Sequence, residues 1–136
     1  MTRKKARDTA FKLIYQVEMQ KETPEHIFET FYMENELHEK ISGYVEDVVF
    51  GVFKNKKSID AIITKLLEGW RLERVSKISL SAIRLSLYEM SYRGDIPESV
   101  SINEAVSLAK EYESTEAASF VNGVLASFIK AKEAKR

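Results

Sequence analysis

The segment ISLSAIRLSLYEM, residues 78–90, decides whether this chain is all-helical or contains a strand. Its apolar residues nearly alternate with polar ones, which in isolation favours a strand. Its length, its few β-branched residues and the lack of a second strand-like segment favour a helix instead. We therefore predict a central helix over residues 78–90, buried on most sides, and with it an all-α fold.

Helix start signals divide the rest of the chain into further helices. Thr2 and Ser58 are placed to cap helix N-termini, and Thr23 precedes a proline, a pair typical of a cap and first helical position. Residues 101–104, Ser-Ile-Asn-Glu, have the form of a capping box. Two further helices are expected to begin near Glu36 and near Thr115.

Apolar residues at the three-to-four spacing mark the buried face of each helix. In the first helix this stripe consists of Ala6, Ala10, Leu13, Ile14 and Val17. Gly43 and Gly51 would let another helix approach the third helix closely. The pair Asn122-Gly123 is typical of a hairpin turn, but here it continues a helical period and is interpreted as a tight packing point.

Composition excludes several classes of protein. The chain has no cysteine, which rules out disulfides and cysteine metal sites, and it has no run of roughly 20 apolar residues that could span a membrane. Neither His26 nor His38 has a second histidine at ligand spacing, and neighbouring Glu46 and Asp47 point about 100° apart on a helix. We expect one domain over residues 1–136 in the cytoplasm, with no membrane contact, metal, cofactor or enzymatic activity.

The first helix carries an unusual cluster of cations in a chain whose net charge is zero. The first twelve residues contain Arg3, Lys4, Lys5, Arg7 and Lys12. They contain a single acidic residue. This asymmetry predicts an electrostatic binding face for an anionic partner.

Winding the first helix at about 100° per residue places Lys4, Arg7, Phe11 and Tyr15 on one face. Cations next to rings suit RNA, because cations pair with phosphates and rings stack on unpaired bases. The alternative left open is a solubilising surface with Phe11 or Tyr15 in the core. A second basic cluster, residues 54–57, is less specific, and its role is also left open.

Several segments resemble the NusB family of transcription antitermination factors over nearly the whole chain. The resemblance lies in the N-terminal Arg-Lys-Lys-Ala-Arg of residues 3–7, in IRLSLYEM of residues 83–90, and in INEAVSLAK and FVNGVL of residues 102–110 and 120–125. Lysines at positions 4 and 5, where many members have arginine, keep the charge but lose the planar fork of a guanidinium. Lys12 stands where glutamine is frequent in the family, so its role is open.

The resemblance implies an all-α domain of about seven helices in two packed three-helix sub-bundles. It implies binding of boxA, a single-stranded element of ribosomal RNA leader transcripts, together with ribosomal protein NusE. The complex would join RNA polymerase and help it to resist premature termination. The implied RNA contacts are Arg3, Lys4, Lys5, Arg7, Phe120 and Asn122, and the implied contact to the protein partner is Tyr15.

Two alternatives stay open at the level of sequence. The chain could be a structural helical adaptor that binds no specific RNA, in which case its N-terminal cations only keep it soluble. It could also be a monomer or a homodimer that covers the RNA face. A NusB-like domain also occurs fused to a ribosomal RNA methyltransferase, and we expect the free-standing factor because the chain ends at Arg136.

Overall fold

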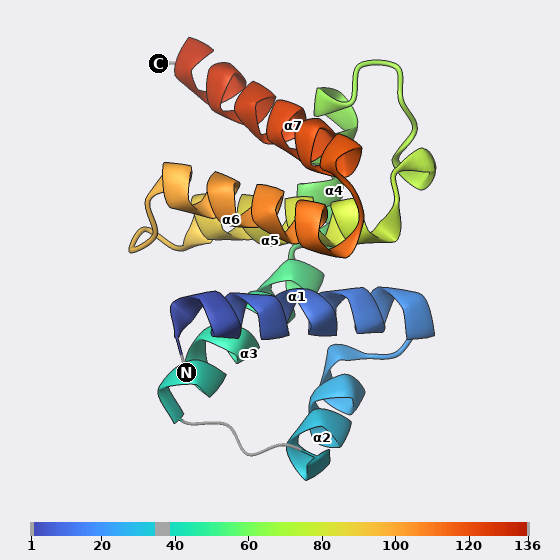
Figure 1. Cartoon of the computed structure of the whole chain (residues 1–136), viewed down its shortest axis with the longest axis vertical. Coiled ribbons are helices and arrows are strands. Elements are labelled where there is room, and N and C mark those ends of the chain that lie inside the picture. The colour runs from blue at the N-terminus through green and yellow to red at the C-terminus, as the bar shows by residue number, and fades with distance from the viewer. Residues whose placement is uncertain (1, 35–38, 136) are drawn as a thin grey trace.

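The computed structural model describes residues 2–34 and 39–135, apart from the side chains of residues 39–42. Seven α-helices and one short 3-10 helix make up this part of the chain (Figure 1). They are α1 (Arg3–Gln20), α2 (Pro24–Glu34), α3 (Glu39–Lys54), α4 (Lys56–Leu66), η1 (Leu72–Arg74), α5 (Lys77–Tyr92), α6 (Glu98–Tyr112) and α7 (Thr115–Ala134). The prediction of an all-α fold is confirmed.

The helices form two groups that meet at α5. Helices α1 to α3 lie in one half of Figure 1 and α4 to α7 in the other, so the second group has one helix more than the expected three. Helix α5 contacts α1 and α3 from the first group and α4, α6 and α7 from the second. None of the helices in the described part of the chain is long and apolar enough to cross a membrane.

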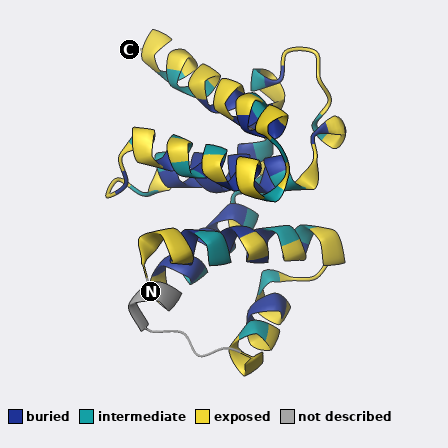
Figure 2. Cartoon of the chain, in the orientation of Figure 1, coloured by how far each residue is buried: buried dark blue, intermediate teal, exposed yellow. Residues whose placement is uncertain are grey.

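The predicted central helix over residues 78–90 is confirmed as α5. Every residue from Ser79 to Glu89 is buried, and Figure 2 shows dark-blue parts of this helix behind α6. Neighbours on several sides remove the need for a polar face, which explains why the sequence lacks the usual helical period. The near-alternation of apolar residues is therefore a result of burial, not of strand structure.

The predicted starts of three helices are confirmed by their caps. The Thr2 hydroxyl accepts from the Lys5 amide at 3.1 Å, and the Thr23 hydroxyl accepts from the His26 amide at 3.1 Å. Helix α7 begins at Thr115, where the Ser114 hydroxyl caps it. The predicted helix start near Glu36 lies outside the described residues.

Two predicted caps are wrong. Helix α4 begins at Lys56 with Asn55 as its N-cap, because a single residue separates it from α3, and Ser58 lies inside the helix. Helix α6 begins at Glu98, directly after Pro97, whose carbonyl accepts from the Ser101 amide at 3.1 Å. Residues 101–104 are therefore already helical and form no capping box, which leaves the Ser101 hydroxyl for a buried contact.

The glycines differ in what surrounds them. A Cβ on Gly51 would overlap the Tyr88 ring, so the predicted close approach of a helix, here α5, is confirmed at this position. A Cβ on Gly43 or Gly123 would meet nothing within 4 Å. The packing role predicted for Gly43 is wrong, because this residue lies on an exposed side of α3. The role predicted for Asn122-Gly123 is wrong as well, because both residues are exposed while the buried stripe of α7 includes Val121 and Leu125.

Candidate nucleic-acid interface

The first turn of α1 presents three exposed cations, Arg3, Lys4 and Lys5, which we call the N-terminal basic cluster. This turn contains no acidic residue. Cations at a helix N-terminus oppose the helix dipole by roughly 0.3–1 kcal/mol each, so helix stability does not explain them. Among the described residues, no ion pair or hydrogen bond neutralises the side chain of Lys4 or Lys5. Two ammonium groups of the cluster are therefore available to an anionic partner.

Arg7 lies one turn further along α1, but its side chain turns inward. Only 3% of the residue is exposed, and its Nε donates to Glu89 Oε2 at 2.9 Å. Burial lowers the pKa of the Arg7 guanidinium, but Glu89, together with Tyr44 and Glu104, more than offsets this, so the pKa lies above its usual value. The pair fastens α1 to α5. RNA contact by Arg7 stays a prediction, and a direct contact would require this buried pair to open.

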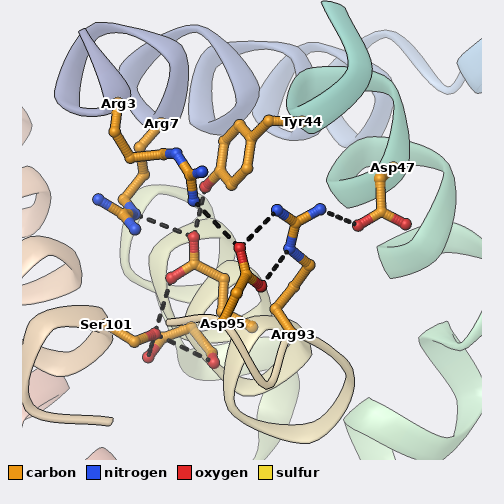
Figure 3. A network of polar contacts seen from close by, with 9 residues as sticks. Arg3, Arg7, Tyr44, Asp47, Arg93, Asp95 and Ser101 are labelled. Atoms are coloured by element: carbon orange, nitrogen blue, oxygen red, sulfur yellow. Dashed lines mark hydrogen bonds and ion pairs between the residues drawn. The ribbon is translucent and has the colours of Figure 1, made fainter. Parts of the chain in front are cut away.

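Glu89 is the centre of a polar network that joins four helices (Figure 3). The Tyr44 hydroxyl of α3 donates to Glu89 Oε2, and the Ser101 hydroxyl of α6 donates to Oε1 at 2.8 Å. Burial and the Glu89 carboxylate both raise the pKa of Tyr44 well above its usual value. A carboxylate this deep is tolerated because each oxygen accepts hydrogen bonds from a charged or hydroxyl donor.

Three guanidinium groups lie around the Tyr44 ring. The guanidinium carbons of Arg3, Arg7 and Arg93 lie 5.0, 5.9 and 5.5 Å from its centroid. Arg93 also donates to Asp47 at 2.9 Å and to Asp95 at 3.0 and 3.1 Å. These contacts hold the Arg93 and Asp95 side chains in place beside the first turn of α1.

Asp95 is the nearest counter-ion of the N-terminal basic cluster. Its Oδ2 lies 3.8 Å from Arg3 Nη1, and both side chains are about half exposed, at 54% and 49%. The hydrogen bond from Arg93 holds the pKa of Asp95 below its usual value, so this carboxylate stays charged. Arg3 is therefore partly neutralised, whereas Lys4 and Lys5 are not.

The predicted face of mixed cations and rings is only partly exposed. Phe11 is buried and packs against Tyr112 with ring centroids 5.4 Å apart, so of the two interpretations left open, its place in the core is confirmed. Lys12 pairs with Asp8 at 3.0 Å and lies 5.4 Å from the Tyr112 ring centroid. Tyr15 is half-buried. Its contact with a protein partner stays a prediction.

Phe120 and Asn122, the other residues expected to contact RNA, lie on α7. Phe120 is half-buried and Asn122 is exposed. Helix α1 begins on the left of Figure 1 and α7 on the right, and RNA contact by Phe120 and Asn122 stays a prediction. Phe120 contacts Trp70, with ring centroids 6.5 Å apart. Sequence reasoning missed Trp70, although a lone tryptophan beside Gly69 was a signal.

The second basic cluster, residues 54–57, divides in the structure. Lys56 pairs with Glu18 at 3.3 Å, where Lys77 and Arg84 also approach the same carboxylate at 3.4 and 3.5 Å. Burial would raise the pKa of Glu18, but Arg84 and the two lysines outweigh it and hold this pKa below its usual value. Lys54 and Lys57 are exposed. Lys56 thus has a structural contact that ties α4 to α1.

The two histidines and the Glu46-Asp47 pair, which the sequence did not support as a metal or acid–base site, can be compared with the structure. Among the side chains described, those of residues 2–34 and 43–135, no group of three or more His, Asp or Glu is arranged to hold a metal ion. His26 is exposed, and His38 lies outside the described residues. Glu46 accepts from the Tyr32 hydroxyl, and Asp47 accepts from Tyr88 and Arg93. The two neighbouring carboxylates therefore have separate partners.

Comparison with known proteins gives a consistent result. Residues 4–130 match the model of the NusB family. A transcription antitermination protein NusB from Acetivibrio thermocellus is 47% identical over 132 residues, which are 97% of this chain and 91% of that protein. One from Listeria monocytogenes is 39% identical and covers 93% of this chain and 94% of its own length.

Solved structures agree with the sequence comparison. NusB from T. maritima has a TM-score of 0.88 at 32% identity and covers 96% of this chain and 92% of that one. A crystal structure of antitermination factors NusB and NusE in complex with double-stranded RNA has a TM-score of 0.84 at 30% identity and covers 96% of this chain and 99% of that one. The fold and the family thus agree.

Proposed function

This chain belongs to the NusB family, and from this premise we propose that it binds boxA RNA of ribosomal RNA leader transcripts together with ribosomal protein NusE. In this role it acts in the cytoplasm and helps RNA polymerase to resist premature termination. Its relatives are transcription antitermination proteins and not enzymes. The chain accordingly works by binding, and its contacts with RNA and protein are what must be explained.

The observation that carries the RNA-binding proposal is the N-terminal basic cluster. Lys4 and Lys5 lie exposed in the first turn of α1, and among the described residues they have no counter-ion. Arg3 is held between the Tyr44 ring and Asp95 at 3.8 Å, so a phosphate can replace the weak pair with Asp95. Neutralising phosphates releases counter-ions from RNA, which is the main source of affinity for such a cluster.

The Glu89 network supports the same role by fixing α1. The buried pair of Arg7 with Glu89 lies one turn from Lys4, so the helix that carries the cations is rigidly attached to α5. A rigid helix presents its cations without the loss of conformational entropy that a mobile tail would incur on binding. Arg7 thus contributes through position, and its own contact with RNA is tested separately below.

The proposal that NusE is a partner is supported by the related complex of NusB and NusE with RNA, in which NusB has the same fold as this chain. That complex contains double-stranded RNA, whereas boxA is proposed here as a single strand, so the experiment must compare both forms. Tyr15 is the proposed contact with NusE through the family resemblance, and its half-buried side chain on α1 leaves part of its surface accessible. A homodimer that covers the basic cluster is a competing state, which sedimentation of the free protein detects.

The test is a titration of fluorescein-labelled boxA RNA, followed by anisotropy, with and without NusE. Three phosphate contacts predict a slope of about −2 for log affinity against log salt, because each contact contributes about −0.7 for a single strand. The Lys4→Ala/Lys5→Ala variant should bind more weakly and lose about 1.4 of that slope. Lys54→Ala/Lys57→Ala, which also removes two exposed lysines, is the matched control and should bind normally.

The outcomes separate the alternatives. Equal affinity for boxA, a scrambled strand and a duplex would support the structural adaptor and exclude specific recognition. Unchanged affinity and slope in the Lys4→Ala/Lys5→Ala variant would exclude the N-terminal basic cluster as the RNA site. Sedimentation of the free protein at the concentrations of the titration shows whether a homodimer competes with RNA.

A further inference from the structure

A groove of about 910 Å³ lies where α3 meets the start of α2 and the end of α5. Its lining includes aromatic rings and carboxylates, namely Phe50, Tyr88, Tyr92, Glu25, Glu46 and Asp47. None of these residues belongs to the N-terminal basic cluster, so the proposed contact with RNA does not explain them. Aromatic rings beside carboxylates are the surroundings that an organic cation prefers.

Tyr92 has the most exposed ring of this lining, because 53% of the residue is exposed. The Tyr88 ring lies beside it, with centroids 5.1 Å apart and planes inclined by 31°. The Tyr92 hydroxyl donates to Asn55 Oδ1 at 3.3 Å, which ties the end of α5 to the residue between α3 and α4. These contacts hold the Tyr92 ring in place while much of it stays open to solvent.

Two of the three carboxylates have no cationic partner among the described residues. Glu25 is exposed in the first turn of α2, and Glu46 accepts from an uncharged tyrosine hydroxyl. Asp47 accepts from Arg93 at 2.9 Å, so its charge is already shared. Lys54 also lines the groove, but the carboxylates remain in excess. The groove therefore has a net negative charge.

The same kinds of groups already hold an arginine of this chain. The Arg93 guanidinium carbon lies 5.5 Å from the Tyr44 ring centroid. The carboxylates of Asp47 and Asp95 accept its hydrogen bonds (Figure 3). A guanidinium suits such surroundings because it can stack on a ring and bond carboxylates in its own plane. The Tyr92 ring shares its groove with carboxylates, but no cation of the described residues lies over it.

We propose that this groove binds an arginine side chain carried by a basic segment of a protein partner. The guanidinium stacks on the Tyr92 ring and pairs with Glu25 or Glu46, whose charge is complementary. Arginine fits better than lysine, whose ammonium is a strongly hydrated point charge without a planar face. The inference goes beyond the proposed binding of boxA and NusE, because it assigns a further protein contact to α2, α3 and α5.

The charge of the groove disfavours other classes of ligand. Its carboxylates repel the phosphates of RNA, in contrast to the N-terminal basic cluster. An apolar peptide that covered Glu25 or Glu46 would remove water from a carboxylate without giving it a partner. A cationic segment satisfies the rings and the carboxylates together.

Amide NMR spectra of the full chain test the site. The probe is the peptide Gly-Arg-Gly-Arg-Gly-Arg-Gly, and matched peptides carry lysine or citrulline in place of arginine. Citrulline keeps the shape of arginine but has no charge. We expect the arginine peptide to shift the amide signals of Gly51, Asn55 and Tyr92, and to bind at least about threefold more tightly than the lysine peptide. The citrulline peptide should cause no shift at the same concentrations.

Variants provide the second measurement. Tyr92→Leu should weaken binding of the arginine peptide by about 2- to 5-fold, because it removes the cation–π contact, whereas Tyr92→Phe keeps the ring and should bind like the original chain. Glu25→Gln should weaken binding by about twofold. Glu29→Gln removes another exposed carboxylate of α2, outside the groove, and is the matched control. Circular dichroism shows that each variant is folded, and the comparison of the three peptides needs no variant.

Each outcome supports or overturns the arginine site. Equal binding of the arginine and lysine peptides would overturn it, as would unchanged binding by both Tyr92→Leu and Glu25→Gln. Shifts of the same amide signals by boxA RNA and not by the peptide would assign the groove to RNA and would also overturn it. The anisotropy titration decides the proposed function separately: a chain that binds the peptide in this groove but binds no RNA keeps the arginine site and excludes the proposed function.

Discussion

Arg7 Nε donates a hydrogen bond to Glu89 Oε2 at 2.9 Å, and the two residues are 82 positions apart in the sequence. Their side chains are 4% and 0% exposed, so the pair is excluded from water. It connects the helix that carries the N-terminal basic cluster to the central helix of the fold. Its stability and its relation to RNA binding can be tested separately.

Glu89→Gln should destabilise the fold by about 3 kcal/mol or more, because it leaves the Arg7 guanidinium buried without a counter-charge. Urea unfolding followed by circular dichroism measures this free energy. The double variant Arg7→Met/Glu89→Leu removes both charges and should be less destabilised than Glu89→Gln alone. A loss below about 1 kcal/mol in Glu89→Gln would contradict a structural role for the buried pair.

Arg7→Met also tests whether Arg7 only positions α1 or contacts the RNA directly. We expect it to lower the free energy of unfolding by about 3 kcal/mol, through loss of the pair with Glu89. At a temperature where the variant stays folded, its salt slope for boxA RNA should match that of the original chain. A slope reduced by about 0.7 would instead show that Arg7 contacts a phosphate directly.

Asp95→Asn should strengthen RNA binding about twofold or more, because Arg3 loses the carboxylate that lies 3.8 Å away and competes with phosphate. The salt slope should become steeper, since one more cation is free to neutralise RNA. Anisotropy of labelled boxA RNA measures both quantities. Glu98→Gln removes a carboxylate that pairs with Lys132 at 2.8 Å, and this control should change neither. Weaker binding by Asp95→Asn would rule out the competition.

Gly51→Ala should destabilise the fold by about 1–3 kcal/mol, because the new methyl group would overlap the buried Tyr88 ring. The same substitution at Gly123 has open space and should stabilise α7 by up to about 1 kcal/mol through helix propensity. Thermal unfolding should show a lower unfolding temperature for Gly51→Ala and a slightly higher one for Gly123→Ala than for the original chain. Equal effects at both positions would contradict the close approach of α3 and α5.

Glu18→Gln should show a stability difference that depends on pH. Arg84, with Lys56 and Lys77, holds the pKa of Glu18 below its usual value, so its carboxylate stabilises the fold at neutral pH and loses this effect as the pH falls through the acidic range. At neutral pH the variant should be about 1 kcal/mol less stable, given the partly exposed ion pairs with Lys56 and Lys77. Urea unfolding from neutral to acidic pH should show the difference shrinking, and a constant difference would exclude the mechanism.

Much of the fold could be predicted from short segments of sequence. Caps at Thr2 and Thr23, and the buried stripe of α1, depend on neighbours within about one or two helical turns. The helix over residues 78–90 needed an argument from length and composition, since burial on several sides had erased its period. Predictions failed where a hydroxyl had two uses, as at Ser101, which bonds Glu89 instead of capping α6.

The sequence by itself determined that the chain is all-helical, that its first helix begins with a cluster of cations, and that it resembles the NusB family. These properties follow from local periodicity and from residue order, which need no tertiary contact. Only the tertiary structure decided which cations of α1 are exposed, because Arg7 is buried by a residue 82 positions away. It also decided that Trp70 lies exposed beside Phe120, since the exposure of a side chain depends on which distant parts of the chain pack around it.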